Sequence, residues 1–463
     1  MRAFIRQQRV VLSVFSVALL AGLVAQAASA ETLIVGTCKT GSQFHTIRQA
    51  IAAATPGSTI YICPGTYGEQ LLITENLTLI GVSANGLAGA TAAGANNPVI
   101  TPPSAGGLDS NASDLYDDSP IAAQIAVVTP SGASTPIKVS LSSIAVDGAN
   151  NQIAGCGPDL VGIYYQNASG TINHVVTRNQ MLATDLGGCQ SGLAIYVESG
   201  YTSGGTAVVT IENSSVHNYQ KNGITVDGSG TVATITGNYV VGQGATPVIA
   251  QNGIQVSDGA NGKVSGNTVT DDVYVNPSDC STASPPDCVG SAGILVYDSG
   301  ATSSSPLTIS GNTVSNTQLA IVAFGDSSGT ADYNAVTSNK VTGTQAASIY
   351  LDDGIDLCSN NNTATSNNVF NSSGSGIHID STCTESTGST GNNTTVTHNI
   401  INEACAGVLT GSGTGSSQSS NTFYNVLQTT QAGDSCPAGA PNSYALGQAS
   451  SVRTRRKPQP LRP

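Results

Sequence analysis

The sequence predicts an all-β protein that winds as a single-stranded parallel β-helix, a solenoid of short stacked strands. One strand-like motif recurs every 27 to 40 residues: a small residue, an aliphatic, any residue, an aliphatic, then a polar turn. The first aliphatic positions of its copies are Ile163, Ile195, Ile224, Ile254, Ile294, Ile321, Ile349, Ile377 and Val408. Because so short a strand cannot bury its apolar face alone, successive copies must stack on one another.

A second motif alternates with the first and contains an aliphatic residue, two further residues, an asparagine, one residue and another aliphatic. Its asparagines are Asn238, Asn267, Asn312, Asn339 and Asn399. Gly, Asn, Ser and Thr turns separate the strands, and helical periodicity is absent, which is typical of the coils of a β-helix. Asparagines at equivalent turns can bond the coils above and below, so we expect them to form structural ladders rather than ligand sites.

The N-terminal residues 1–30 read as a cleavable secretory signal. Arg2, Arg6 and Arg9 precede an apolar run from Val10 to Val24, and Ala28-Ser29-Ala30 has the small-x-small form of a signal peptidase site. We therefore expect a protein that is secreted, periplasmic or on the cell surface, exported by a Sec-type signal. No later segment has the length and apolarity of a membrane span.

Residues 31–81 predict an N-terminal cap and first coil. The stretch from Phe44 to Ala54 is a short amphipathic helix that Pro56-Gly57 ends, and a strand and a tight turn at Pro64-Gly65-Thr66-Tyr67 follow. Such a helix can cover the open end of a solenoid. These residues, with Leu77-Thr78-Leu79-Ile80-Gly81, resemble the cap of the pectin-lyase-like right-handed parallel β-helix proteins, many of them exported by bacteria. The resemblance implies a right-handed helix and does not indicate a reaction.

The remainder of the chain is expected to form one solenoid domain followed by a tail. Residues 82–450 hold the repeats, with loop insertions at 82–120 and around Cys280 to Cys288. Residues 451–463 are basic and without the ladder pattern, so we expect a disordered tail. Between residues 31 and 450, seven basic residues stand against 28 acidic ones, a net formal charge of −21. Such a body should repel nucleic acid, and it should repel acidic polysaccharides unless a cation such as Ca²⁺ intervenes. We expect a monomer.

Ten cysteines in an exported chain predict five disulfides rather than catalytic thiols or a zinc site. The sequence order suggests pairs of neighbours: Cys38 with Cys63, Cys156 with Cys189, Cys280 with Cys288, Cys358 with Cys383, and Cys405 with Cys436. The second, fourth and fifth pairs are about one coil apart, so stacking would place their sulfurs on adjacent coils.

Residues between and after the inward aliphatics should line one outer face of the solenoid. That face mixes aromatic rings and carboxylates, and its candidate substrate-binding residues are Tyr164, Tyr196, Glu198, Asp227, Tyr297, Asp326 and Tyr350. Rings can stack on sugars and carboxylates can accept hydrogen bonds from hydroxyls, which suits a polysaccharide lying along the helix. The structural alternative is that the aromatics stack to stabilise the sheet and the aspartates form turns.

The densest chemical grouping is Asp352, Asp353 and Asp356, with His378 and Asp380 one coil later. Adjacent coils lie about 4.8 Å apart, so Asp352 and Asp380 would face each other and separate into an acid and a base. Glycosidic hydrolysis requires such a pair, whereas the same carboxylates could instead bind Ca²⁺. The grouping is similar to that of polygalacturonase-type glycoside hydrolases, which implies Asp352 and Asp353 as the acid pair, His378 as the histidine and Asp326 as a third acid. With Asp380, which the stacking places opposite Asp352, the candidate catalytic residues are Asp352, Asp353, His378 and Asp380.

The match to those hydrolases departs in two respects. His378 does not stand between two glycines, and no Arg-x-Lys element follows it. The strand frame also has an alternative, with Gly354-Ile355-Asp356-Leu357 as the inward ladder. A lyase is disfavoured because basic residues are scarce near the acidic face.

We therefore expect an exported β-helix that binds extracellular polysaccharide and is hydrolase-like if it is catalytic. The alternative is a non-catalytic surface, matrix or adhesion scaffold. A hydrolase requires the acids to converge in an open groove, whereas a covering loop argues for the scaffold.

Overall fold

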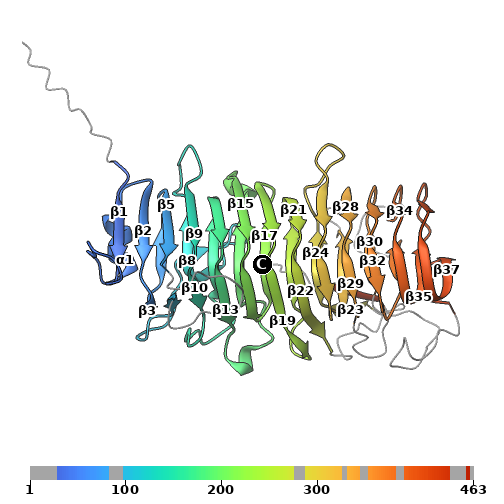
Figure 1. Cartoon of the computed structure of the whole chain (residues 1–463), viewed down its shortest axis with the longest axis horizontal. Helices are drawn as coiled ribbons and strands as arrows, with labels where there is room; N and C mark the ends of the chain where they lie inside the picture. The colour runs from blue at the N-terminus through green and yellow to red at the C-terminus, as the bar shows by residue number, and fades with distance from the viewer. Residues whose placement is uncertain are drawn as a thin grey trace, which may run out of the picture.

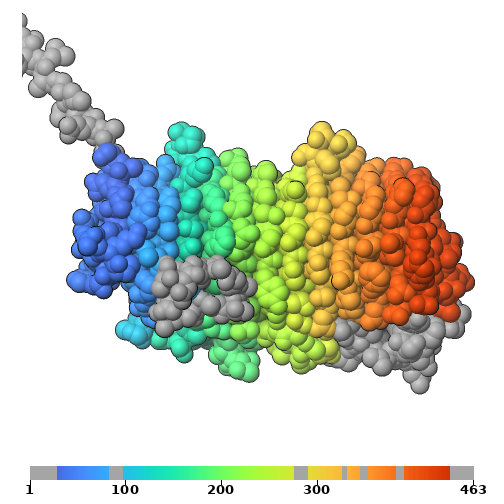
Figure 2. Space-filling view, in the orientation of Figure 1, coloured from blue at the N-terminus to red at the C-terminus, as the bar shows by residue number. Residues whose placement is uncertain are grey.

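The repeats wind into one elongated solenoid whose coils follow the sequence from one end to the other (Figure 1). The computed structural model describes residues 29–82, 97–275, 287–325, 331–344, 353–381, 390–437 and 455–458. Within them nearly every strand pairs in parallel with the equivalent strand of the next coil, as predicted. The space-filling view shows the same succession of stacked coils (Figure 2).

One face of the solenoid is a sheet of 13 strands, each from a different coil. In order they are β1 (Thr32–Val35), β2 (Ser58–Ile62), β5 (Leu77–Gly81), β9 (Lys138–Ser142), β12 (Ser169–Asn173), β15 (Ala207–Glu212), β18 (Thr231–Thr236), β21 (Asn261–Ser265), β25 (Leu307–Ser310), β28 (Asn334–Thr337), β31 (Thr363–Thr365), β34 (Thr395–Thr397) and β36 (Ser417–Ser419).

A second stack of strands carries the predicted first motif. It comprises β4 (Leu71–Ile73), β8 (Pro120–Val128), β11 (Asp159–Gln166), β14 (Leu193–Glu198), β17 (Asn222–Asp227), β20 (Asn252–Ser257), β24 (Ala292–Tyr297), β27 (Leu319–Phe324), β30 (Ile355–Cys358) and β33 (Ile377–Ile379), and it continues into the long strands β35 (Ile400–Thr410) and β37 (Thr422–Ala432).

A third stack joins it at the corner of each coil and runs into the first parts of β35 and β37. Its other members are β3 (Gly65–Gly68), β6 (Pro98–Thr101), β10 (Ala145–Asp147), β13 (Val176–Gln180), β16 (Ser215–Tyr219), β19 (Tyr239–Thr246), β22 (Thr268–Tyr274), β26 (Thr313–Ser315), β29 (Lys340–Thr342) and β32 (Asn368–Phe370). Two single-turn 3-10 helices, η1 (Thr184–Leu186) and η2 (Tyr201–Ser203), lie in the connections.

The aliphatic residues of the first motif form the inner wall of the solenoid. Their register runs in order through Ile163, Ile195, Ile224, Ile254, Ile294, Ile321, Ile355, Ile377 and Val408. All of them are fully buried. The sequence expectation was wrong in one coil, where Ile355 takes the place assigned to Ile349, which lies outside the described residues. Both frames fit the motif, since a small residue precedes each, but Gly354 matches the Gly or Ala found before the other inward aliphatics, whereas Ser348 precedes Ile349.

The small residue of the first motif has a steric cause. A Cβ atom on Gly253 would lie 2.4 Å from Val269 Cγ1 and 2.7 Å from the carbonyl oxygen of Gly293 on the next coil. Gly354 and Gly376 would collide in the same way with Val369 and Ile401. Glycine is therefore favoured at these positions, where the second and third stacks meet and the backbone of one coil lies directly against the next. In β14 and β27 the equivalent residues are Ala194 and Ala320, both fully buried.

The predicted asparagine ladder is present at the turns. The Nδ2 atom of each member donates to Oδ1 of the next at 2.9–3.0 Å, through Asn238, Asn267, Asn312, Asn339, Asn367, Asn399 and Asn421. Each Nδ2 also donates to a backbone carbonyl, as Asn339 does to Ile309. These side chains satisfy buried backbone groups at every turn, which confirms their structural role.

The predicted capping helix is α1 (Ile47–Ala53), packed over the N-terminal end of the solenoid. Thr46 caps it by accepting from the Gln49 amide, and Ile47 and Ala50 are buried. The carboxylate of Glu69 accepts from the amides of Ile47 and Arg48, each at 2.8 Å, and so satisfies two further groups of the first turn.

Three predicted disulfides are confirmed: Cys38–Cys63, Cys156–Cys189 and Cys405–Cys436. Cys358 is disulfide-bonded as well. Its expected partner Cys383, and Cys280, lie outside the described residues, and the side chain of Cys288 is not among those described. Three disulfides fit a protein of an oxidising compartment.

The remaining predictions concern the N-terminal signal sequence, membrane spans and the C-terminal tail. The signal sequence lies almost wholly outside the described residues and stays a prediction. No helix among the residues that the structure describes has the length and apolarity needed to cross a membrane. The predicted disordered tail stays a prediction; of it the structure describes β38 (Arg455–Pro458), which pairs in parallel with β23 (Asp287–Gly290). The short strand β7 (Ala112–Ser113) pairs with β8 in the antiparallel direction. It lies within the loop of residues 109–118, which covers part of the second stack.

Candidate functional site

The predicted outer strip of aromatics and carboxylates lies on the second stack but is not open to solvent. Tyr164, Tyr196 and Tyr297 are at most 2% exposed, and Glu198 and Asp227 are fully buried. The expectation of an exposed glycan track along these residues was therefore wrong. Tyr297 packs edge-on against Phe324 with ring centroids 5.0 Å apart, in a buried apolar cluster. Asp326 and Tyr350 lie outside the described residues.

The loop of residues 109–118 covers part of this strip, and the strip holds it in place. The Tyr196 hydroxyl donates to Asp114 Oδ2 at 2.9 Å, and the Tyr164 hydroxyl donates to the Ser113 carbonyl at 3.0 Å. Both hydroxyl oxygens also lie within hydrogen-bond distance of the Glu198 carboxyl group, which accepts from the Leu115 amide. These side chains clasp a loop rather than a sugar.

The buried acids of this clasp retain their protons more strongly than exposed acids do. Burial, and next the charge of Asp114, raise the pKa of Glu198 to about 8, against the hydrogen bonds from Tyr164 and Leu115. Burial likewise raises the pKa of Asp114 and, to about 7, that of Asp159. The pKa of Asp227 is raised well above its ordinary value by burial and by Asp258 and Glu198.

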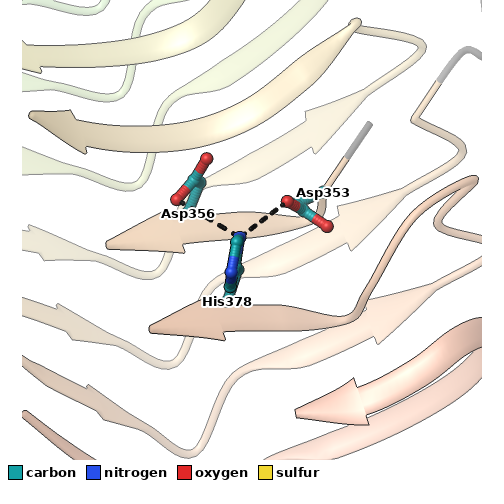
Figure 3. Close-up of side chains that lie close together, drawn as sticks. All are labelled: Asp353, Asp356 and His378. Atoms are coloured by element: carbon teal, nitrogen blue, oxygen red, sulfur yellow. Dashed lines mark hydrogen bonds and ion pairs between the residues drawn. The ribbon is translucent and has the colours of Figure 1, made fainter. Parts of the chain in front are cut away.

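Of the predicted catalytic residues, Asp353, His378 and Asp380 converge toward the other end of the solenoid. Asp356 of β30 and His378 of β33 are register partners on adjacent coils. Asp353 precedes β30 and Asp380 follows β33, so short flanking segments bring both carboxylates to the imidazole. Figure 3 shows Asp353 and Asp356 pointing toward His378. A fifth residue, Asp434, comes from the segment after β37. We call Asp353, Asp356, His378, Asp380 and Asp434 the imidazole–carboxylate centre.

Both ring nitrogens of His378 face carboxylates. Its Nδ1 lies 3.2 Å from Asp353 Oδ2, 3.7 Å from Asp380 Oδ2 and 3.9 Å from Asp356 Oδ1. Its Nε2 lies 3.1 Å from Asp434 Oδ1. The other oxygen of Asp353 accepts from the amide and the hydroxyl of Ser375, each at 2.7 Å. Ser375 thus fixes Asp353, and Asp353 fixes the orientation of the imidazole.

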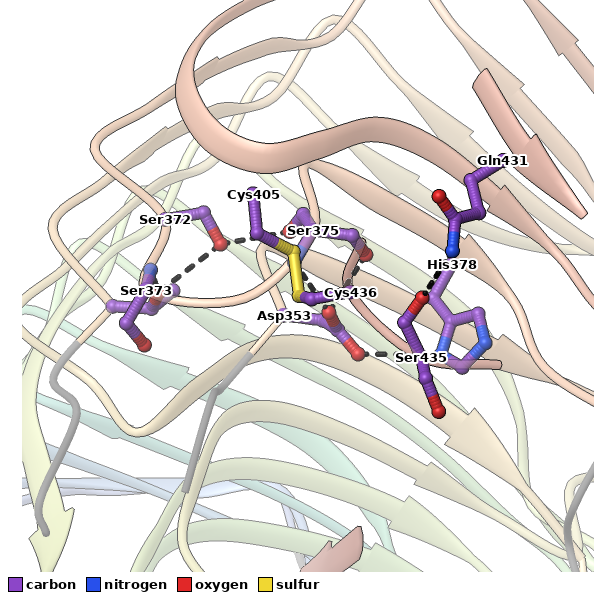
Figure 4. The surroundings of a disulfide bond; sticks show 10 residues. Asp353, Ser372, Ser373, Ser375, His378, Cys405, Gln431, Ser435 and Cys436 are labelled. Carbon is purple, nitrogen blue, oxygen red and sulfur yellow. Dashed lines mark hydrogen bonds and ion pairs between the residues drawn. A yellow bond between two sulfur atoms is a disulfide. The ribbon is translucent and has the colours of Figure 1, made fainter. Parts of the chain in front are cut away.

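The imidazole–carboxylate centre is closed in this structure. His378 is fully buried, and Asp353 and Asp380 are 1% exposed. The segment that carries Asp434 lies over the imidazole, and the Cys405–Cys436 disulfide anchors it beside Asp353 and His378 (Figure 4). The amide and hydroxyl of Ser381 donate to Asp434 and hold its carboxylate. The acids converge as predicted, but under a cover rather than in an open groove.

Comparison with known proteins identifies the family. The sequence profile described as "Right handed beta helix region" matches residues 161–348 and 249–423, which together span more than half of the chain. The chain belongs to the right-handed β-helix family. The pectin-lyase-like resemblance of the cap is thereby confirmed at the level of the fold. A search of curated proteins finds no match to this β-helix protein.

Solved structures with a similar winding include enzymes of several kinds. The catalytic domain of a GH87 α-1,3-glucanase shares 12% identity over 88% of this chain and 68% of its own, with a TM-score of 0.49. The A-module of a mannuronan C-5 epimerase from Azotobacter vinelandii shares 13% identity over 83% and 91%, with a TM-score of 0.41. A pectin methylesterase from Erwinia chrysanthemi shares 15% identity over 63% and 80%, with a TM-score of 0.36.

Sequence reasoning found part of the centre of this β-helix protein. Asp353, His378 and Asp380 were named as catalytic candidates, and the structure brings them together. Asp352 lies outside the described residues, and its predicted place opposite Asp380 depended on the frame that proved wrong. Asp434 was missed because it follows the last repeat. The signal for it was its position two residues before Cys436, whose predicted bond to Cys405 returns that segment to this coil.

Two sets of ligand atoms in the centre could hold a cation. One is Asp353, Asp356 and His378, and the other is His378, Asp380 and Asp434; within each set the atoms lie within 4.8 Å of one another. Ca²⁺ prefers an all-oxygen shell, whereas an imidazole nitrogen with carboxylates suits a transition metal or Zn²⁺. The donor atoms therefore fit the predicted Ca²⁺ less well than a metal that accepts histidine.

Proposed function

We propose that this β-helix protein acts on an extracellular polysaccharide and that the imidazole–carboxylate centre is its processing site. The observation that carries the proposal is the convergence of four carboxylates from separate segments on the two nitrogens of one histidine. Buried titratable groups with specific charge partners are typical of functional sites. The predicted signal sequence and the disulfides support an extracellular substrate.

The chemistry that fits these groups is proton transfer during cleavage of a glycosidic bond. Hydrolysis requires one group to protonate the leaving oxygen and a carboxylate to act as base or nucleophile. Asp353, held by Ser375, orients His378 so that Nε2 can accept or donate a proton. Asp356 and Asp380, both within 4 Å of Nδ1, supply the second carboxylate.

Turnover requires the covering segment, residues 433–437, to open. Asp434 Oδ1 contacts the Nε2 atom of His378 in this structure, so a sugar reaches the imidazole only after this segment moves. The disulfide at Cys436 keeps this segment attached to β35 while it moves. We propose the closed arrangement as the resting state, in which Asp434 stands where a substrate hydroxyl would bind.

The test is a screen of the purified protein against neutral and acidic polysaccharides, with and without Ca²⁺, that measures release of reducing ends. Asp353→Asn and His378→Gln should lower the rate at least about a hundredfold, as expected for loss of a general acid or base. Asp117→Asn, an exposed carboxylate outside the centre, should leave it unchanged. Equal rates in the three variants would overturn the assignment of the centre, provided that circular dichroism shows all three folded.

A non-catalytic scaffold is the second candidate function. The burial of the imidazole–carboxylate centre and of Tyr164, Tyr196 and Tyr297 favours it. Among the predicted site residues that the structure describes, no pair of acids is open to solvent. A scaffold should bind polysaccharide without releasing reducing ends from any substrate in the screen. The same experiment therefore separates the two functions.

A further inference from the structure

We propose that a surface cavity near the N-terminal half of the solenoid is a binding site for a neutral sugar. The cavity measures about 490 Å³, within the range of small-molecule sites. Its walls are the loop of residues 129–136 after β8, the end of β11, and the turn after η2. We call it the loop cavity. The proposal rests on the proposed function only in taking a carbohydrate as the ligand.

The wall of the loop cavity matches the chemistry of an uncharged sugar. It offers hydroxyls and amides from Thr129, Ser134, Gln166, Asn167 and Thr206, together with the apolar side chain of Leu115. No charged side chain lines it. Sugars combine hydroxyls with apolar C–H faces, so they need both kinds of wall. Because the body around the cavity carries a net formal charge of −21, a uronate would be repelled and gain no ion pair.

Polar groups of the wall are held in place before a ligand arrives. The Asn167 side chain donates from Nδ2 to Ser203 Oγ at 3.0 Å and accepts from the Gly200 amide at 3.2 Å. The Thr129 hydroxyl donates to the Asn167 carbonyl at 2.5 Å and accepts from the Ile137 amide at 3.0 Å. These bonds tie the loop to β11 and η2, so the cavity is a built feature of the fold. A wall fixed in advance loses little entropy on binding.

An aromatic pair with one exposed ring lies on two segments that also line the cavity, η2 and the loop that carries Leu115. Tyr116 follows the lining residue Leu115 and is 60% exposed, and its ring meets that of Tyr201 edge-on with centroids 5.6 Å apart. The Tyr201 hydroxyl donates to Asp227 Oδ1 at 2.9 Å, which fixes this ring as a support for the first. A large tyrosine ring left in water beside a neutral, hydroxyl-lined cavity is suited to stack on a sugar.

The loop cavity is remote from the imidazole–carboxylate centre. Seven coil steps separate β11 from β33, about 34 Å at the usual spacing of strands. One polymer chain lying along the solenoid can therefore be held at the loop cavity while another part of it reaches the centre. This adds a neutral-glycan anchoring site to the proposed processing site.

The experiment measures binding by calorimetry and ligand-observed NMR with His378→Gln protein, in which processing is removed. The probes are neutral gluco-, manno-, xylo- and galacto-oligosaccharides, with oligogalacturonate as the anionic comparison. Tyr116→Ala should weaken neutral binding about three- to tenfold, the worth of one aromatic contact. Ala133→Trp, which fills the cavity from an exposed loop, should abolish binding. Tyr424→Ala removes a tyrosine of similar exposure at the far end and is the matched control.

The outcomes separate this inference from the proposed function. Neutral binding that is lost in Ala133→Trp and kept in Tyr424→Ala supports the loop cavity, even if no polysaccharide is cleaved. Binding that all three variants retain, preference for oligogalacturonate, or no binding of any neutral probe overturns it, even if cleavage at the centre is found. Thermal unfolding of each variant shows that the comparison is between folded proteins.

Discussion

The Nε2 atom of His378 lies 3.1 Å from Oδ1 of Asp434, although the two residues are 56 positions apart. This contact closes the imidazole–carboxylate centre, because Asp434 belongs to the segment that leads to Cys436 and covers the ring. A histidine held between carboxylates under a disulfide-anchored cover is protected from reagents in water. Its accessibility therefore reports directly on the cover.

Replacing Asp434 by Ala should expose His378. The variant loses the contact at Nε2 and the bonds from Ser381 that hold the covering segment, so the segment should detach more often. We expect diethyl pyrocarbonate to modify His378 at least about tenfold faster than in the unaltered protein, since loss of a charge-assisted hydrogen bond of about 1.5–3 kcal/mol shifts opening by that order. Mass spectrometry of peptides measures the rate. His398, which is exposed, serves as the internal reference; unchanged protection of His378 would show that Asp434 does not hold the cover.

The repeats made much of this fold predictable, because their signal is local. The inward aliphatic position, occupied by Ile224 in one coil, and the asparagine position, occupied by Asn267 in another, both recur about once per coil. A residue that must point inward or bond the next coil can therefore be recognised in most copies. The cysteine pairs Cys156–Cys189 and Cys405–Cys436 followed from the same spacing, since one coil brings their sulfurs together.

The burial of the outer strip could not be predicted from the repeats. Tyr196 is covered through its bond to Asp114, 82 residues earlier, in a loop that belongs to no repeat. Whether Ile349 or Ile355 faces inward was likewise undecided by spacing alone. Contacts made by insertions depend on long-range packing, so the candidate site was only partly visible in the sequence.

The stability of the clasp around Glu198 should depend on pH. Its pKa rises from an ordinary value of 4.5 to about 8 in the folded protein, chiefly through burial. The folded state therefore binds a proton that the unfolded state releases, so this contribution to stability is complete below about pH 4.5 and is lost as the pH rises through about 8. Asp159, with a pKa of about 7, acts in the same direction.

Glu198→Gln should flatten that dependence, because an amide keeps an acceptor for the Leu115 amide and cannot ionise. One pKa unit corresponds to about 1.4 kcal/mol, so we expect the variant to remove about 3–4 kcal/mol of the fall in unfolding free energy between pH 5 and 8. Urea unfolding at several pH values measures it. Glu212→Gln, a partly exposed carboxylate on β15, is the control. If both variants keep the slope of the unaltered protein, the clasp does not bind the proton.

The asparagine ladder should be most sensitive in its middle. In Asn339→Ala the backbone amide and the Nδ2 of Asn312 lose their acceptor, and the Ile309 carbonyl loses a donor. Buried groups left unsatisfied cost about 1–3 kcal/mol each, so we expect a loss of about 2–4 kcal/mol after partial relaxation. Asn421→Ala, at the partly exposed end of the ladder, should cost less than about 1 kcal/mol. Equal losses at the two positions, measured by urea unfolding, would contradict a cooperative ladder.

Gly253 takes the small-residue position of its repeat and should not tolerate even a methyl group, although Ala194 and Ala320 take the equivalent position in two other repeats. In Gly253→Ala the new Cβ would lie 2.4 Å from Val269 Cγ1 and 2.7 Å from the Gly293 carbonyl oxygen. Such overpacking costs about 1–3 kcal/mol, because either the valine or the neighbouring coil must shift. Gly155→Ala, whose nearest neighbour is a carbonyl oxygen at 3.7 Å, should leave the unfolding free energy within about 0.5 kcal/mol.

Shortening Val269 separates its clash with a Cβ at Gly253 from the other close contacts at that position. Val269→Ala alone should destabilise the protein, because it removes two buried methyl groups from the core. Combined with Gly253→Ala it removes the clash at Cγ1 but leaves those at Asp272 Oδ2 and the Gly293 carbonyl oxygen, each at 2.7 Å, so the double variant should be more stable than the sum of the single losses predicts by about 0.5–2 kcal/mol. Strictly additive losses would mean that the contacts with Asp272 and the neighbouring coil, rather than with Val269, demand glycine.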